Sequence, residues 1–338
     1  MLYSQTAMTQ PKMPHIVLLG TGGTIASTAS GSTAVTDYEV TEGVESLLKA
    51  VPEIAKLAKV SGEQLFNVES YAITNKMLLK MAKRVNTLLA DPNVDGIVIT
   101  HGTDTLEESA YFLNLTVKSH KPVVVVGAMR PGSAISADGP LNLYHAVLLA
   151  SHPEASGQGV LVVLNDRIHA ARFVSKANTT QVDAFRSYDQ GCVGYINDQR
   201  VHWFQTATRL HTMQTDFDVS GAKALPHVDI IYDHQSAGLH LYEASVAAGA
   251  QGIVLAASGN GSLSPQAQKG ARLAAQHKVM FVRSSRVGSG LVSASASDAR
   301  RHLISADSLN PQKARILLML ALGITTDRKT IQSYFDRY

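Results

Sequence analysis

Short apolar runs alternate with amphipathic segments along the N-terminal half of the chain. Four of these runs predict buried strands, at residues 15–19, 94–100, 122–127 and 159–164. Between residues 77 and 89, apolar side chains recur at helical spacing, with Thr74 or Asn75 available as a cap and Pro92 beyond the end. Continuous apolar strands that alternate with helices predict a mostly parallel sheet covered on both faces.

A second alternation of the same kind begins near Val228. Strands are predicted at 228–232, 252–257 and 279–283, and Asn310 before Pro311 predicts the start of a late helix. Apolar runs lapse between 206 and 226, and 338 residues favour two domains over a single core. We therefore divide the chain into an N-terminal extension (1–14), a first domain (15–205), a linker (206–226) and a second domain (227–338).

Composition narrows the class of protein. Hydrophobic residues make up 45% of the chain and charged residues 17%, which is typical of a globular α/β protein. The net charge is +3 with Lys and Arg scattered, so nucleic acid is not an expected partner. The longest apolar stretches fall short of the roughly 18 residues that a membrane span needs. Cys192 is the only cysteine, which excludes a disulfide within one chain.

The N-terminus and the histidines give expectations about compartment and cofactors. The segment 1–14 has neither the basic region nor the apolar core of a secretory signal, which predicts a cytoplasmic protein. A different natural N-terminus would leave the periplasm as the alternative. The 13 histidines show no spacing typical of metal ligands, so neither a metal nor another cofactor is expected.

Two turns rich in glycine and threonine each follow a predicted buried strand. They are Gly20-Thr21-Gly22-Gly23-Thr24 and His101-Gly102-Thr103-Asp104-Thr105. In open α/β sheets, ligands bind beyond the carboxyl ends of strands, so both turns are expected to border one site. A nucleotide site is not favoured. Ile25 occupies the position where the dinucleotide fingerprint has Gly or Ala, and the chain has no Gly-Lys-Ser/Thr motif.

The threonine hydroxyls of these turns are candidate nucleophiles, provided that a neighbour accepts the proton or lowers the pKa. The segment 27–37 is rich in small and hydroxyl-bearing residues, which suits a mobile lid, and Tyr38 at its far end could swing over the first turn. In the second turn, Thr103 offers a hydroxyl, Asp104 a carboxylate and the backbone N–H groups an oxyanion hole. The structural alternatives are a packing role for Tyr38 and a helix cap at Thr105.

Longer motifs complete a pattern that is known from one family. Met129-Arg130-Pro131 follows the third predicted strand, Ser284-Ser285-Arg286 follows a strand of the second domain, and the segments 136–140 and 309–315 add to the pattern. With the two turns, these motifs make the chain resemble the bacterial type II L-asparaginase and glutaminase-asparaginase family over residues 16–338. The resemblance implies a two-domain α/β fold, with a larger N-terminal mixed sheet covered by helices and a smaller C-terminal parallel sheet.

The resemblance also implies roles for single residues. Thr24 matches the family's nucleophile, Tyr38 the tyrosine that pairs with it, and the trio Thr103, Asp104 and Lys176 the cluster that handles protons. The resemblance implies that the substrate is bound by Thr103 and Asp104 and, in addition, by Gly23, Ser70, Tyr71, Gly102, Ala128 and Ser262. Ser70 follows the strand-like run 64–68. Ser262 matches a position that reaches a neighbouring subunit, so residues 227–338 are expected to complete that subunit's site.

The chain departs from the family at the pocket for the substrate's α-ammonium group. Tyr71 stands where the family usually has Gln or Glu. The neighbouring subunit commonly contributes an acid whose place falls near Ser295, and Asp298 is the only acid nearby. Asp104 is therefore expected to carry most of the interaction with the ammonium, and asparagine is expected to bind more weakly than in relatives with the full set.

Taken together, the residues and the resemblance predict an amidohydrolase that acts as a homotetramer of two dimers. It would hydrolyse L-asparagine to L-aspartate and ammonia through a threonine acyl-enzyme, with L-glutamine left open as a second substrate. Two alternatives stay open: an enzyme that is chiefly a glutaminase or other amidase, and a non-catalytic amino-acid binding protein. Threonines on two strand ends, with Lys176, disfavour the second, because binding a zwitterion needs charges and donors rather than spare hydroxyls. Whether Thr24 or Thr103 attacks first also stays open.

Overall fold

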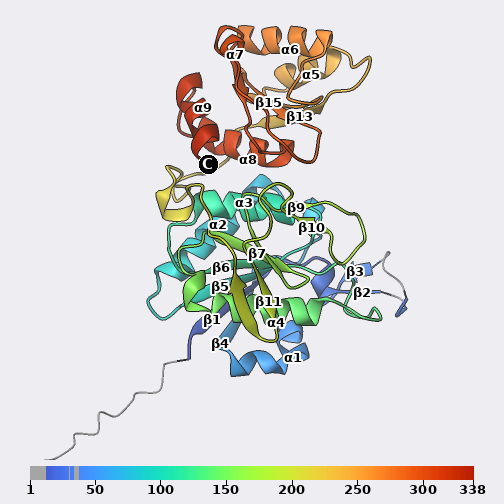
Figure 1. Ribbon diagram of the computed structural model, residues 1–338, viewed down its shortest axis with the longest axis vertical. Coiled ribbons are helices and arrows are strands. Elements are labelled where there is room, and N and C mark those ends of the chain that lie inside the picture. The colour runs from blue at the N-terminus through green and yellow to red at the C-terminus, as the bar shows by residue number, and fades with distance from the viewer. Residues whose placement is uncertain (1–12, 30, 34–37) are drawn as a thin grey trace, which may run out of the picture.

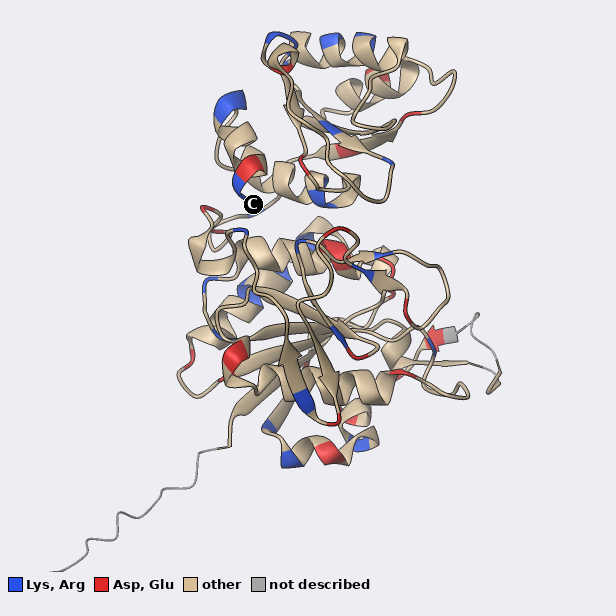
Figure 2. Cartoon of the chain, viewed as in Figure 1, with Lys and Arg blue, Asp and Glu red and all other residues tan. Residues whose placement is uncertain are grey.

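The computed structural model describes residues 13–29, 31–33 and 38–338. Figure 1 shows two α/β units, one above the other. The larger unit contains an eight-stranded sheet, and the smaller contains a four-stranded sheet. Basic and acidic residues are spread over both units (Figure 2). Within the described ranges, no helix is long and apolar enough to cross a bilayer.

The larger sheet has the strand order β12-β11-β8-β7-β6-β5-β1-β4. Its five strands from β7 to β4 are parallel, and β8, β11 and β12 continue the sheet in antiparallel fashion. The sheet is therefore mixed, as the resemblance implies. Its strands are β1 (His15–Gly20), β4 (Lys59–Gln64), β5 (Gly96–Thr100), β6 (Val123–Val126), β7 (Val160–Leu164), β8 (Arg167–Ala170), β11 (Gly194–Asn197) and β12 (Arg200–Trp203).

Helices cover both faces of this sheet, which explains why its central strands are apolar at every position. Alternate residues of one strand enter different cores: Val17 and Leu19 pack with α2 (Asn75–Ala90) and α3 (Leu106–Thr116). Ile16 and Leu18 pack with α1 (Val44–Ala50) and α4 (Gly139–Ala150). A strand buried on both faces needs apolar side chains in both directions. The predicted cap of α2 is confirmed, because Thr74 Oγ1 accepts from Met77 N at 3.3 Å.

The strand order places a topological switch point at β1. The chain runs from β1 to β4 on one side and then crosses to β5 on the other side. Such a reversal leaves a crevice at the carboxyl ends of the two central strands, where ligands bind in open α/β sheets. Gly20, the last residue of β1, pairs with Thr100, the last residue of β5, so both turns begin at the same level. The fold therefore opens its crevice between the two glycine-threonine turns.

The smaller unit is an all-parallel sheet with the order β13-β14-β15-β16. The predicted start of its late helix is confirmed, because Asn310 Oδ1 accepts from Lys313 N at 3.0 Å. That helix, α8, packs against α3 of the larger unit and shares a core with it. The elements are β13 (Val228–Tyr232), β14 (Gly252–Ala257), β15 (Met280–Ser285), β16 (Leu303–Ser305), α5 (His240–Ala247), α6 (Pro265–Gln276), α7 (Ala296–Arg300), α8 (Pro311–Leu322) and α9 (Arg328–Arg337).

The remaining elements are short strand pairs and 3-10 turns. They are the strand pairs β2 (Ser27–Ala29) with β3 (Tyr38–Val40) and β9 (Ser175–Lys176) with β10 (Phe185–Arg186), and the 3-10 turns at Thr24–Ala26, Pro52–Lys56, Ser70–Ala72, Pro153–Ala155 and Thr212–Gln214.

Two local expectations are wrong. The strand-like run 64–68 is not a strand, because β4 occupies 59–64 and the N–H groups of Leu65 and Phe66 both turn to Gly20 O. Thr105 stands at the N-cap position of α3 but makes no side-chain cap. Its hydroxyl donates instead to Ser70 O at 2.8 Å. A contact between loops has replaced the local cap.

Candidate active site

Three loops at the crevice touch through their backbones. A Cβ atom on Gly23, whose φ is +81°, would lie 2.2 Å from the backbone nitrogen of Gly102. A Cβ atom on Gly102 would lie 2.8 Å from Ser70 Oγ. Real Cβ atoms do not approach so closely, so glycine at both positions lets the loops after β1, β4 and β5 meet. The structure thus brings together Gly23, Gly102 and Ser70, three residues for which the resemblance implies a role in substrate binding.

The two candidate nucleophiles sit on facing turns. Thr24 begins the short helix after β1, and Thr103 lies in the turn after β5; their residues are only 3% and 5% exposed. Thr21 fastens one strand end to the other, because its Oγ1 donates to Thr100 O at 2.7 Å. Ser27 Oγ donates to Gly23 O at 2.9 Å and thereby stabilises the first turn. The crevice therefore presents threonines from two separate strands.

Lys176 connects the second turn to the rest of the site. Its Nζ donates to Thr103 Oγ1 at 2.9 Å and to Asp104 Oδ1 at 2.6 Å. Lys176 lies on the hairpin β9–β10, and the backbone N of Lys176 donates to Glu107 Oε2 at 3.0 Å. The lysine side chain is mostly buried, whereas that of Asp104 is 57% exposed and available to a ligand. The trio thus combines a hydroxyl in contact with an amine and an accessible carboxylate, which are groups that can take part in acid–base catalysis.

Ser70 lies at the junction between the loops after β4 and β5. Its Oγ accepts from Thr105 N at 3.4 Å, and its side chain is buried against the second turn. Tyr71, the next residue, is 72% exposed. The structure therefore brings Ser70 into the group and leaves Tyr71 on the rim.

Glu69 is a residue that the sequence analysis missed. Ser70 contacts Thr105, and the residues that precede these two, Glu69 and Asp104, lie close enough to interact electrostatically. Partial burial raises the pKa of Glu69, and the negative charge of Asp104 raises it further. Two carboxylates that share a site favour a cation between them. The only signal in the sequence is that an acid directly precedes the predicted carboxylate-binding serine.

Of the other predicted residues, Ala128 is buried in the core, and the side chain of Tyr38 lies outside the described residues. Ala128 is fully buried beyond β6, in a loop shaped by Asp138, whose carboxylate accepts from Met129 N and Arg130 N at 2.9 Å each. The backbone of Tyr38 begins β3, but its side chain and the lid residues 30 and 34–37 lie outside the described residues.

His101 serves the packing of the second turn. Its ring nitrogens contact Gly102 O at 2.7 Å and Ser109 Oγ at 2.9 Å. Burial lowers the pKa of His101 to about 4, so the ring is neutral at physiological pH. In the part of the chain that the structure describes, no group of three or more His, Cys, Asp or Glu residues could hold a metal ion.

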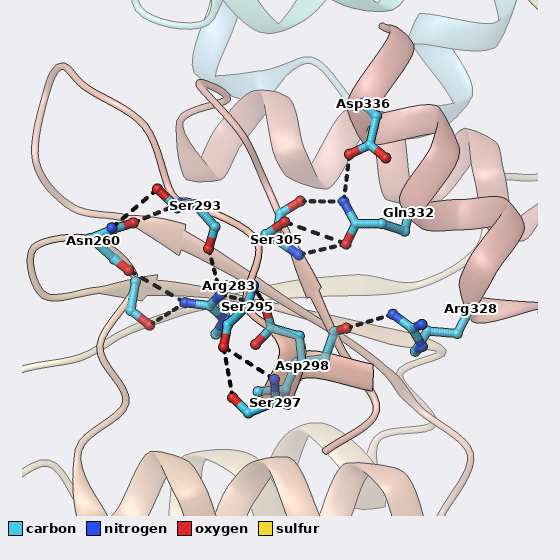
Figure 3. A network of polar contacts seen from close by, with 12 residues as sticks. Asn260, Arg283, Ser293, Ser295, Ser297, Asp298, Ser305, Arg328, Gln332 and Asp336 are labelled. Atoms are coloured by element: carbon cyan, nitrogen blue, oxygen red, sulfur yellow. Dashed lines mark hydrogen bonds and ion pairs between the residues drawn. The ribbon is translucent and has the colours of Figure 1, made fainter. Parts of the chain in front are cut away.

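Ser262 belongs to the smaller unit, in a turn after β14 closed by a bridge to Ser258. Within that turn, the N–H group of Ser262 donates to Ser258 O at 2.9 Å. Asp298 lies elsewhere in the same unit, where it forms a buried ion pair with Arg283 at 2.7 Å and accepts from Ser295 N at 2.8 Å (Figure 3). The acid that the sequence places near Ser295 is thus paired with an arginine inside its own unit.

Arg283 fixes the turn that carries Ser262. Its Nη1 donates to Gly261 O at 3.0 Å, and its Nη2 donates to Ser293 O at 3.0 Å as well as to Asp298 (Figure 3). One buried guanidinium therefore connects the turn at 259–262 to the segment at 293–298.

Comparisons with known proteins give matches over both units. A family model described as asparaginase, N-terminal, matches residues 15–209, and one described as glutaminase/asparaginase C-terminal domain matches residues 227–335. The chain is 56% identical to L-asparaginase 2 of Bacillus subtilis, over 99% of this chain and 89% of that protein. It is 43% identical to a glutaminase-asparaginase of Pseudomonas fluorescens, over 98% of this chain and 92% of that protein.

A solved structure shows the same fold. The crystal structure of a probable cytoplasmic L-asparaginase from Campylobacter jejuni superposes with a TM-score of 0.94, at 47% identity, and covers 96% of this chain and 100% of that one. Similarity of this extent, in sequence and in structure, shows that the chain belongs to the asparaginase family.

Proposed function

We propose that this protein hydrolyses the side-chain amide of L-asparagine to give L-aspartate and ammonia. The observation that carries the proposal is the contact of Lys176 Nζ with both Thr103 Oγ1 and Asp104 Oδ1, on a turn whose backbone meets that of Gly23. Membership of the asparaginase family and similarity to proteins named L-asparaginase support the same substrate. No cofactor takes part in this reaction.

In this proposal, Thr24 Oγ1 attacks the amide carbon and forms an ester. The proton of its hydroxyl travels through Thr103, Lys176 and Asp104 to the amide nitrogen, which leaves as ammonia. Backbone N–H groups near Gly23 and Thr103 stabilise the oxyanion that forms in between. A water molecule then cleaves the ester, gives one proton back to Thr24 and releases L-aspartate. Tyr38 assists the nucleophile when the lid closes.

The ends of the substrate are held by different groups. Ser70 receives the α-carboxylate, with Gly102 and Ala128 completing the wall, and Asp104 receives the α-ammonium. Residues 15–205 carry this chemistry, and residues 227–338 of a neighbouring subunit complete the pocket through Ser262. The working unit is then at least a dimer, and a tetramer of two such dimers repeats the interface.

Ammonia release from L-asparagine and L-glutamine, measured side by side, tests the proposal. Turnover of asparagine that disappears in a folded Thr24→Ala variant supports it. Faster turnover of glutamine would keep the chemistry and change the preferred substrate. Release of ammonia from neither amide, by wild-type protein that binds asparagine, would favour an amino-acid binding protein.

A further inference from the structure

A cavity of about 560 Å³ opens beside the β9–β10 hairpin of the larger unit. Arg167 and His169 of β8 form part of its wall, and Arg186 of β10 and Asn178 of the hairpin loop form another part. None of the candidate active-site residues in the described part of the chain lines it. Its volume lies in the range of about 300–1,000 Å³ that is typical of small-molecule sites. The cavity is therefore a second concave feature, separate from the threonine crevice.

The charged side chains of this wall leave an excess of positive charge. Arg186 pairs with Asp183, which also lines the cavity. Arg167 forms no salt bridge with any residue that the structure describes. A guanidinium presents a planar set of donors that matches the oxygens of a carboxylate or phosphate group. Arg167 is thus a cation at the cavity wall that could still bind a carboxylate or phosphate group.

His169 reports the electrostatic potential at the inner wall. The residue is only 2% exposed, and its Nδ1 lies 2.9 Å from Ser187 Oγ. Burial is the main cause that lowers the pKa of His169 to about 4, and the charges of Arg167, Lys313 and Arg186 lower it further. These three groups are all cations, and each makes the electrostatic potential at the ring more positive. The ring itself is neutral at physiological pH.

His169 also has an unused polar atom. Its Nε2 has no hydrogen-bond partner among the described residues. A buried polar atom without a partner costs stability, and such atoms are usually satisfied by a water molecule or a ligand. A molecule bound against this wall would supply the missing partner, directly or through a water molecule.

We propose that the cavity lined by Arg167, His169 and Arg186 binds a small organic anion through a carboxylate or phosphate group. Arg167 binds the anionic oxygens in bidentate fashion, and Asn178 provides an amide donor at the mouth. The potential at the wall is positive, and Arg167 has no carboxylate partner among the described residues, so a cationic ligand is excluded. The arginines at the wall also disfavour an apolar ligand.

The position of the cavity gives binding a consequence for the hairpin. Lys176 pairs with Phe185 across β9 and β10, and the residues that follow Lys176, Ala177 and Asn178, line the cavity. An anion held between β8 and the hairpin loop therefore restrains the segment that delivers Lys176. Anion binding itself does not depend on the proposed reaction, so the two can fail independently.

Isothermal titration calorimetry of the whole protein with inorganic phosphate, and separately with succinate, at constant ionic strength tests the site. We expect saturable binding of at least one anion, and an affinity that falls about tenfold or more in Arg167→Gln, which loses a charge-assisted bidentate contact. Arg167→Lys keeps the charge without the fork geometry and should retain part of the affinity. Binding of phosphate alone would indicate a phosphorylated ligand, and binding of succinate a carboxylate.

Arg200→Gln is the matched control, because it removes the same charge from an exposed position on β12 that does not line the cavity. Circular dichroism establishes that each variant is folded. The proposal is overturned if wild-type protein binds neither anion saturably. It is also overturned if Arg167→Gln binds like wild type, or if both glutamine variants lose affinity equally, since binding would then lie elsewhere or reflect net charge alone.

Discussion

Arg283 and Asp298 form an ion pair inside the smaller unit, with 2.7 Å between Nη2 and Oδ2 and both side chains buried. The same guanidinium donates to Gly261 O, directly before Ser262. The pair therefore holds a turn that we expect to face a neighbouring subunit.

Asp298→Asn should lower the free energy of unfolding by about 3–5 kcal/mol, because it leaves a buried guanidinium without its counter-charge. Urea denaturation measures the change. Asp336→Asn is the control, since this aspartate is exposed and hydrogen-bonded to Gln332, and its loss should change stability by about 0.5 kcal/mol or less. Equal effects of the two substitutions would show that the buried pair has no special contribution.

Thr24→Ala and Thr103→Val should each lower kcat by at least about 10³-fold and leave the fold intact, because each removes a group that acts in the transition state. Steady-state ammonia release measures the loss. A well-folded variant of either kind with turnover within about tenfold of wild type would exclude that threonine from the mechanism.

Glu69→Gln should raise KM for asparagine several-fold with little change in kcat, because the carboxylate beside Asp104 favours the substrate's ammonium and not the reacting amide. The pKa of Glu69 is raised, so its ionisation disfavours the folded state, and stability is lost as pH rises through that pKa. The glutamine variant should therefore be at least as stable as wild type at neutral pH.

Asparagine binding and stability are thus expected to change in opposite directions in this variant. Glu53→Gln, a change at an exposed position in the 3-10 turn Pro52–Lys56, should alter neither quantity. If the Glu69→Gln enzyme had the KM of wild type, Asp104 and not Glu69 would be the acid that contacts the substrate's ammonium group.

Shared sites can be tested by mixing inactive proteins. A folded Thr24→Ala protein and a Ser262→Arg protein, refolded together in equal amounts, should regain about a quarter of wild-type activity, because half of the dimers are hybrids and each hybrid holds one intact site. Each parent refolded alone should stay inactive. If each site used Thr24 and Ser262 of the same chain, mixing would restore nothing. Light scattering of the wild type should report a dimer or a larger assembly.

Acidification should destabilise the protein through His101 and His169. Burial lowers the pKa of both rings to about 4, while the unfolded chain protonates near 6.5. The stability that the neutral rings contribute is complete above pH ~6.5 and is lost as pH falls towards ~4, by on the order of 3 kcal/mol for each ring. Urea denaturation at pH 7 and pH 5 measures the slope. His101→Gln should flatten it, and the exposed His277→Gln should not.

The sequence allowed the two threonine turns to be placed correctly, since an apolar run followed by small residues fixes both a strand and the turn after it. Lys176 is different. Its contact with Thr103 joins residues 73 positions apart, so no local pattern distinguishes it from other lysines, and only the resemblance singled it out. Glu69 was missed because both causes of its raised pKa, partial burial and the charge of Asp104 on another loop, arise only in the folded chain.

The error at β4 has a similar origin. This edge strand reads Lys-Val-Ser-Gly-Glu-Gln, and its backbone pairing with β1, rather than an apolar pattern, makes it a strand. The hydroxyl of Thr105 likewise turns from its own helix to Ser70 because a distant loop offers a carbonyl oxygen. Contacts between loops, which sequence periodicity does not encode, therefore decide the details of the site.

The close approach of Gly23 and Gly102 limits how this site can be redesigned. A methyl group on either glycine would collide with backbone or with Ser70, so the floor of the crevice admits no larger side chain. A mutant library intended to change the accepted amide would gain little from these positions. Diversity belongs at the rim, at Glu69 and the exposed Tyr71, and at Ser262, which a second chain would bring to the pocket. It does not belong at Gly261, where a Cβ atom would lie 2.6 Å from the Val292 side chain.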